Sequence, residues 1–146
     1  MSIDDLIKVL QASIAPCVLI SGLALLLLSM TNRLARPIDR IRLLSGELRR
    51  IPKEEGTSLR EQIKILYKRC HLLQTSITFT MVSILLVSVI ILILFSTYIF
   101  NIHLESLVEI FFMGSLICLI AAVVYFIWDI RFSLRSVKIE IDKHFS

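Results

Sequence analysis

One side of the first predicted helix carries the residues whose types and spacing could do chemistry. Intervals of four and three residues give a face that is polar at one end, small or aliphatic in the middle and basic at the other end; its members are Asp4, Lys8, Gln11, Ala15, Val18, Gly22, Leu25, Ser29, Arg33 and Arg36. Residues at these intervals share one side of an α-helix, so several copies around an axis would turn this face toward a pore. Asp4 would then form an acidic outer ring, with Val18 and Leu25 as hydrophobic constrictions. Arg33 and Arg36 would form an inner basic vestibule.

A second interpretation of the same face stays open. Ala15 and Gly22 let a neighbouring helix approach closely, as small residues commonly do inside membranes. The charged residues at the two ends then simply lie in water. Under this interpretation the face is ordinary helix packing and no pore exists.

The elements that position this face are membrane spans. The chain of 146 residues is 56% hydrophobic and 19% charged, compared with an apolar content of about 45–50% in average soluble domains. Apolar runs at 12–30, 72–100 and 107–128 can each cross a bilayer, which takes about 20 residues. A backbone in lipid must satisfy its own hydrogen bonds, and these runs are too long for barrel strands. The predicted fold class is therefore an all-α membrane protein with three transmembrane helices.

The distribution of cations predicts how these helices are oriented. Eleven of the sixteen Lys and Arg residues lie between the first two spans, whereas the short connector at 101–106 has none. Cytosolic loops are enriched in Lys and Arg. We therefore predict that the N-terminus lies outside, and that the long connector and the C-terminus lie in the cytosol.

The long connector is predicted to fold as a basic helical hairpin over residues 37–71. Its second arm has apolar residues at heptad spacing that continues into the second span: Leu59, Ile63, Leu66, Cys70, Leu73 and Ile77. Ser58 and Glu61 form a capping-box pattern that places the start of this helix near Leu59. The first arm has an apolar stripe of Leu34, Ile38, Ile41, Leu44 and Leu48. Helix breakers at 51–56 predict the turn.

Two further helical segments complete the predicted architecture. Helix one is predicted to occupy 1–36, because Pro37 disfavours helical geometry in the residue before it. Residues 129–146 are predicted to form an amphipathic helix that packs against the hairpin through Ile130, Leu134, Val137, Ile141 and Phe145. These stripes predict a cytosolic helical bundle, formed within one chain or between chains.

The inner end of helix one carries a basic cluster of Arg33, Arg36, Arg40 and Arg42. One interpretation is a topology anchor, and a second is contact with anionic lipid headgroups, each cation contributing about 1 kcal/mol near the surface. Nucleic acid is not an expected partner, because the cations are dispersed among apolar positions and no recognised binding module accompanies them.

No sequence motif for catalysis or for a cofactor is present. There is no glycine-rich phosphate loop, HExxH motif or nucleophile elbow. We therefore expect no enzymatic activity, no cofactor and no metal site. Cys17, Cys70 and Cys118 lack the spacing of a disulfide framework or a zinc site, so we expect them to pack as small apolar groups.

Hydroxyl side chains recur on one face of the second helix. Ser76, Thr80 and Ser83 are separated by four and three residues. Hydroxyls inside membranes often hydrogen-bond to a neighbouring helix or to a carbonyl of their own helix. We predict that these three hold helices together and do not line a path for a solute.

Three motifs connect part of the chain with a known family. They are QAS-x-AP at Gln11–Pro16, MT-x-RLAR at Met30–Arg36 and DR-x-R at Asp39–Arg42. The stretch from Gln11 to Leu44 resembles a bacterial family of small membrane proteins called domain of unknown function 2721. The resemblance implies a multi-pass protein of the bacterial inner membrane. It brings no catalytic residues with it.

Two functional hypotheses follow. The small-residue face and the apolar stripes offer more interface than one chain can bury, which favours a homo-oligomer, and helix one would then line the pore of an ion channel. The alternative is a non-conducting scaffold or accessory subunit whose cytosolic bundle docks a partner protein. A pore requires a closed ring of subunits, whereas an accessory subunit does not.

Overall fold

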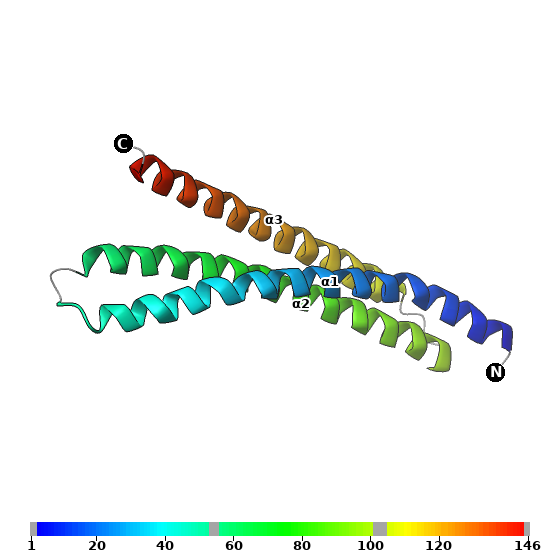
Figure 1. Cartoon of the computed structure of the whole chain (residues 1–146). Coiled ribbons are helices and arrows are strands. Elements are labelled where there is room, and N and C mark those ends of the chain that lie inside the picture. The colour runs from blue at the N-terminus through cyan, green and yellow to red at the C-terminus, as the bar shows by residue number, and fades with distance from the viewer. Residues whose placement is uncertain (1–2, 53–55, 101–104, 145–146) are drawn as a thin grey trace. The chain divides into compact units, whose positions relative to one another are not determined.

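Three long α-helices make up the computed structural model: α1 (Ile3–Leu48), α2 (Thr57–Phe100) and α3 (Glu105–His144) (Figure 1). The structure describes residues 3–52, 56–100 and 105–144, and their side chains except at 3–6, 9, 98, 100, 105, 132 and 134–144. No strand occurs in these ranges. The segments Leu10–Leu48, Thr57–Thr97 and Ser106–Arg131 are long and apolar enough to cross a membrane. The predicted all-α class and the three apolar helices are confirmed.

The helices contribute to two compact units. Unit 1 consists of Met1–Leu28 and Thr78–Ala122, and unit 2 consists of Ser29–Ile77 and Val123–Ser146. Each helix contributes residues to both units. Each is also longer than the roughly 20 residues that a bilayer requires.

Unit 1 is built around small residues where α2 and α3 pack. A methyl group added at Gly114 of α3 would lie 3.6 Å from Leu86 Cδ1 of α2, an ordinary van der Waals contact. The Ser83 hydroxyl of α2 donates to the Ser115 carbonyl of α3 at 2.9 Å. Small side chains let helix backbones approach closely inside a membrane. The α2–α3 pair of unit 1 is therefore held by close packing and an interhelical hydrogen bond.

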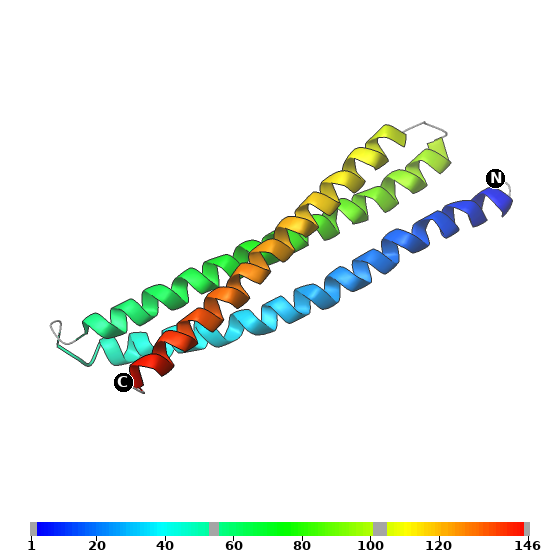
Figure 2. The ribbon, with the colours of Figure 1, turned by 90° about the horizontal axis from the view of Figure 1, so that it is seen from above.

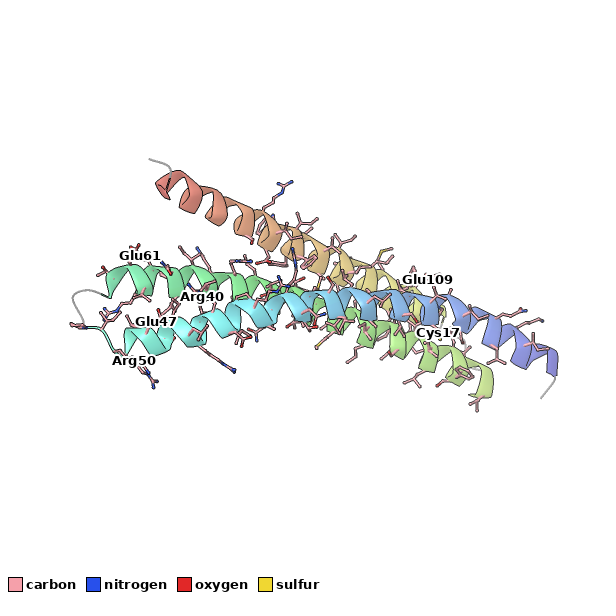
Figure 3. The ribbon with its side chains drawn as sticks, viewed as in Figure 1. Cys17, Arg40, Glu47, Arg50, Glu61 and Glu109 are labelled. Carbon is pink, nitrogen blue, oxygen red and sulfur yellow. The ribbon has the colours of Figure 1, made fainter. Side chains whose placement is uncertain are left out.

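Unit 2 contains the predicted hairpin, formed by the end of α1 and the start of α2. The two arms run side by side and antiparallel in both views (Figures 1 and 2). Leu44 of α1 is 3% exposed, and Leu73 and Ile77 of α2 are 0% and 7% exposed. The heptad seam predicted on the second arm is confirmed, since its other members are half-buried. The exposed charged residues Arg40, Glu47, Arg50 and Glu61 also lie on this hairpin (Figure 3).

Helix α1 differs from prediction at Pro37. It was expected to end at Arg36 but continues unbroken to Leu48. Pro37 lacks the N–H that would bond one turn back, which ordinarily weakens a helix. Here Pro37 is buried whereas Ile38 is 36% exposed. The helix thus continues with Pro37 in a buried position, where apolar burial of the ring is favourable. The expected packing role of Ile38 is wrong.

The start of α2 also differs slightly from the capping-box prediction. The helix begins at Thr57, and the Gly56 carbonyl accepts a hydrogen bond from the Arg60 amide at 3.1 Å. Gly56 is buried, and a methyl group added there would lie 2.7 Å from Leu48 Cδ1. Gly56 thus stands at the cap position in place of Ser58, and the end of the Leu48 side chain would have to shift to admit a larger residue there.

Helix α3 continues past the third predicted span to His144. Ile130 is half-buried. The side chains of Leu134, Val137 and Ile141, and all of Phe145, lie outside the described residues, so the predicted packing of this stripe remains a prediction.

Candidate functional site

The predicted pore-facing side of α1 is exposed wherever unit 1 describes it. Val18 is 66% and Leu25 is 70% exposed. The same side also exposes Lys8, Gln11, Ala15 and Gly22. The side chain of Asp4 lies outside the described residues. None of the residues that the structure describes in unit 1 therefore covers this face.

The opposite side of α1 makes the contacts within unit 1. Ser13 is 7% exposed and Leu23 is 3% exposed, while Ile20 and Leu27 are half-buried. These residues are separated by three, four or seven positions, the spacing of a helix–helix seam. One side of α1 thus packs within the chain, and the other side is exposed.

The two glycines of unit 1 differ in whether another helix lies beside them. Gly114 lies close to Leu86, whereas a methyl group added at Gly22 would meet no atom within 4 Å. A glycine in a helix interior costs about 1 kcal/mol relative to alanine, and close packing can offset that cost. No such packing is present at Gly22 among the described residues of the chain.

In unit 2 the same face becomes basic. Ser29, Arg33 and Arg36 are exposed. The guanidinium carbon of Arg33 lies 5.3 Å from the centroid of the Phe126 ring of α3. A cation over an aromatic face is attracted by the ring quadrupole. Arg33 is therefore held beside α3, an arrangement that helical spacing alone could not indicate.

An ion pair between α2 and α3 is the feature that the sequence reasoning missed. Arg69 Nε lies 3.5 Å from Asp129 Oδ1, and the two side chains are 22% and 2% exposed. Arg69 is one of the eleven cations between the first two spans, and no motif in the sequence singles out Asp129. A carboxylate that directly follows an apolar span, opposite a helix that carries an arginine, is the signal that could have identified the pair.

The geometry of this pair is unusual for a stabilising contact. Within the described part of the chain, neither Arg69 Nε nor Asp129 Oδ1 has a hydrogen-bond partner. Attraction between buried charges offsets their desolvation only when good hydrogen bonds accompany it. The pair therefore depends on charge compensation, and the loss of one partner would leave the other charge uncompensated.

The predicted packing role of Ser76, Thr80 and Ser83 is confirmed by their burial, and by contacts of Ser76 and Ser83 with other helices. Ser76 and Thr80 are 0% exposed, and Ser83 is 1% exposed. The Ser76 hydroxyl lies 3.4 Å from the sulfur of Met30 in unit 2. All three side chains are closed to solvent, and Ser76 and Ser83 contact a neighbouring helix.

Ser83→Ala should lower the free energy of unfolding by about 0.6 kcal/mol, because an interhelical hydrogen bond in a membrane contributes about that much. Ser88→Ala is the matched control, since the Ser88 hydroxyl donates to the Ile84 carbonyl of its own helix at 2.9 Å. Unfolding of the purified chain in detergent measures both. Equal losses would show that the Ser83–Ser115 contact has no special role.

Cysteines and metal ligands offer no further site among the described residues. All three cysteines are free, and no group of three His, Cys, Asp or Glu residues is placed to hold a metal ion. Cys70 and Cys118 are half-buried. Cys17, on the unit 1 part of α1, is exposed, so its predicted burial is wrong (Figure 3). It lies beside the buried seam and not on it.

Three long apolar helices with small-residue packing and a buried ion pair define an all-helical, multi-pass membrane protein. The chain belongs to the family described as Protein of unknown function (DUF2721), which it matches over residues 13–139. The family resemblance seen in the stretch from Gln11 to Leu44 is confirmed and extends over most of the chain. No curated protein and no solved structure matches it.

Proposed function

We propose that the chain is a subunit of a homo-oligomeric ion channel whose axis is lined by α1. The lining consists of the exposed face of α1 in unit 1: Lys8, Gln11, Ala15, Val18, Gly22 and Leu25. The observation that carries this assignment is that only one side of α1 packs within the chain. The side that does not pack exposes the polar and small residues Gln11, Ala15 and Gly22 beside large aliphatic residues.

The composition of the free face favours an axis over lipid. A helix side that meets only lipid gains nothing from Gln11 or from a glycine such as Gly22. Polar side chains within spans usually face a bundle interior or a water-filled cavity. Val18 and Leu25 lie two turns apart on this face, so a ring of subunits would have two hydrophobic constrictions.

The proposed orientation rests on the charge distribution, and the proposed membrane rests on what the family resemblance implies. We place the protein in the bacterial inner membrane with the N-terminus outside and the Arg-rich hairpin in the cytosol. Eleven of the sixteen Lys and Arg residues between the first two spans support this orientation. No reaction, cofactor or metal is assigned to the protein.

Disulfide trapping in the bilayer tests the subunit contact. Cys17, Cys70 and Cys118 are first replaced by alanine, and a single cysteine is then placed at Val18 or at Ala24. Both positions are exposed, but six residues at about 100° each place Ala24 about 120° from Val18. Oxidation should link subunits through position 18 and not through position 24. Equal linking at both positions, or none at position 18, would rule out an α1-lined axis.

Conductance then tests whether ions pass. Leu25→Ala should raise the single-channel conductance in planar bilayers, because it widens a hydrophobic constriction. Leu28→Ala removes the same atoms from an exposed position off the face and should leave conductance unchanged. A linked assembly that conducts nothing, with or without Leu25→Ala, would contradict the channel function.

The second candidate is a scaffold, favoured by two exposed apolar side chains on the hairpin. Leu43 is 62% and Tyr67 is 67% exposed, both outside the predicted spans. Large apolar groups exposed to water often mark protein contacts. A photo-crosslinking residue at position 67 should then give adducts with one other protein in cells. Adducts with lipid alone, or none, would contradict the scaffold.

A further inference from the structure

Unit 2 concentrates uncompensated positive charge on one side of α1. Arg33, Arg36 and Arg40 follow at intervals of three and four residues, and all three are exposed. Among the described side chains, no acidic group lies within 4.0 Å of any of them; the pair of Arg69 with Asp129 is the ion pair found there. The charge of Arg69 is therefore neutralised within the chain, whereas the charge on this side of α1 is not.

Contact with α3 fixes the position of the Arg33 guanidinium along the helix axis. Its guanidinium lies over the Phe126 ring at 5.3 Å and yet stays exposed. A ring contact occupies the face of the guanidinium and leaves its N–H groups free to donate in the plane. Planar, bidentate donation is what makes arginine suited to phosphate.

Near Phe126, α3 also carries aromatic residues of the kind that lie at a membrane interface. Trp128 is 58% exposed, and its ring makes an edge contact with Tyr125 at 6.1 Å between centroids. Phe126 and Trp128 differ by about 3 Å along the helix axis. Amphipathic aromatic rings favour the headgroup region of a bilayer. Arg33 is therefore at the depth where lipid phosphates lie.

We propose that Arg33 and Arg36 bind the phosphate of an anionic phospholipid at the junction of α1 with Phe126 of α3. A membrane lipid fits this site better than free phosphate, because the cations adjoin an apolar ring and apolar spans. Zwitterionic phosphatidylcholine has the same phosphate but a compensating choline charge. Phosphatidylglycerol has no such charge and binds preferentially. This site does not depend on the channel function.

A tryptophan reporter measures lipid preference at the site. Trp128 is the single tryptophan of the chain, so Trp128→Phe with Ser29→Trp leaves one indole, about one turn from Arg33 on the same exposed face. The full chain is placed in phosphatidylcholine vesicles that contain a fixed share of either brominated phosphatidylglycerol or brominated phosphatidylcholine. Bromine quenches the indole when that lipid lies beside it.

Brominated phosphatidylglycerol should be enriched beside the indole about fivefold for each arginine that contacts it, relative to brominated phosphatidylcholine. Arg33→Gln with Arg36→Gln should abolish the preference while quenching by phosphatidylcholine stays unchanged, which shows that the fold is kept. Arg33→Lys should retain only part of it, because lysine lacks planar donors.

Arg50→Gln with Arg60→Gln is the matched control, since it removes the same charge from exposed positions outside the basic cluster. Arg50 lies 14 residues beyond Arg36, at the far end of the hairpin. The control should keep the preference for phosphatidylglycerol. An equal loss in the control, or equal quenching by both lipids in the parent protein, would overturn the site and leave general surface attraction as the explanation.

Discussion

Arg69→Met is expected to lower the free energy of unfolding by about 3–5 kcal/mol, the range found when one partner of a buried ion pair is removed. The reason is the position of Asp129, whose side chain is 2% exposed. Without Arg69 its carboxylate would be a buried charge with no counter-ion. Lys68→Met is the matched control, because Lys68 is the preceding residue and is exposed. It should change the free energy by less than about 0.5 kcal/mol.

Asp129→Asn should lower the free energy of unfolding by about 1–3 kcal/mol, which is less than the effect of Arg69→Met. Arg69 is 22% exposed and has a long side chain that can move its charge toward water. The double variant Arg69→Met with Asp129→Leu should recover most of the loss, because apolar replacements often match a buried ion pair. Reversible unfolding in mixed detergent micelles measures the whole cycle. Similar effects of Arg69→Met and Lys68→Met would show that the pair is not buried in the folded protein.

Leu73→Ala is expected to have the second largest effect and to lower the free energy of unfolding by about 2–4 kcal/mol. Leu73 is 0% exposed in unit 2, where the seam of α2 packs. Its removal leaves a cavity, and the surrounding side chains lose dispersion contacts that lipid cannot replace. The same unfolding assay measures the change.

Leu43→Ala is the control for that cavity, since it makes the same chemical change at a position that is 62% exposed. Its effect should be below about 0.5 kcal/mol. If the two variants were equally destabilised, the packing of the hairpin would differ from the one described.

Most features that depend on the spacing of apolar residues along the sequence were predicted correctly. Long apolar runs predicted three helices, because lipid allows a backbone few other structures. The heptad spacing from Leu59 to Ile77 predicted the seam, since side chains at this spacing recur on one side of a helix. Ser76, Thr80 and Ser83 were assigned correctly for the same reason.

Predictions failed where three-dimensional packing outweighs local preference. Pro37 was expected to end the helix, but its ring is buried in unit 2 and α1 continues past it. Gly56, beside Leu48, stands at the cap position where Ser58 was predicted. The partners Arg69 and Asp129 are 60 residues apart in the sequence, and no local pattern joins residues on different helices.

The candidate site was predicted in part. Helical spacing groups the residues from Lys8 to Leu25 on one side of α1, and that side is exposed. That this side lines a pore stays a prediction. Helical spacing could not show that Arg33 lies over Phe126 of α3, because that contact depends on how two helices cross.

The mass of the intact complex in lipid nanodiscs, measured by native mass spectrometry, tests the central claim most directly. A channel lined by α1 should have about four or more copies of the chain. Gly22→Leu should break it into monomers, whereas Gly46→Leu should not, although a side chain at either glycine meets open space within the chain. A monomer or dimer in the parent protein, or an assembly indifferent to Gly22→Leu, would contradict an axis lined by this face of α1.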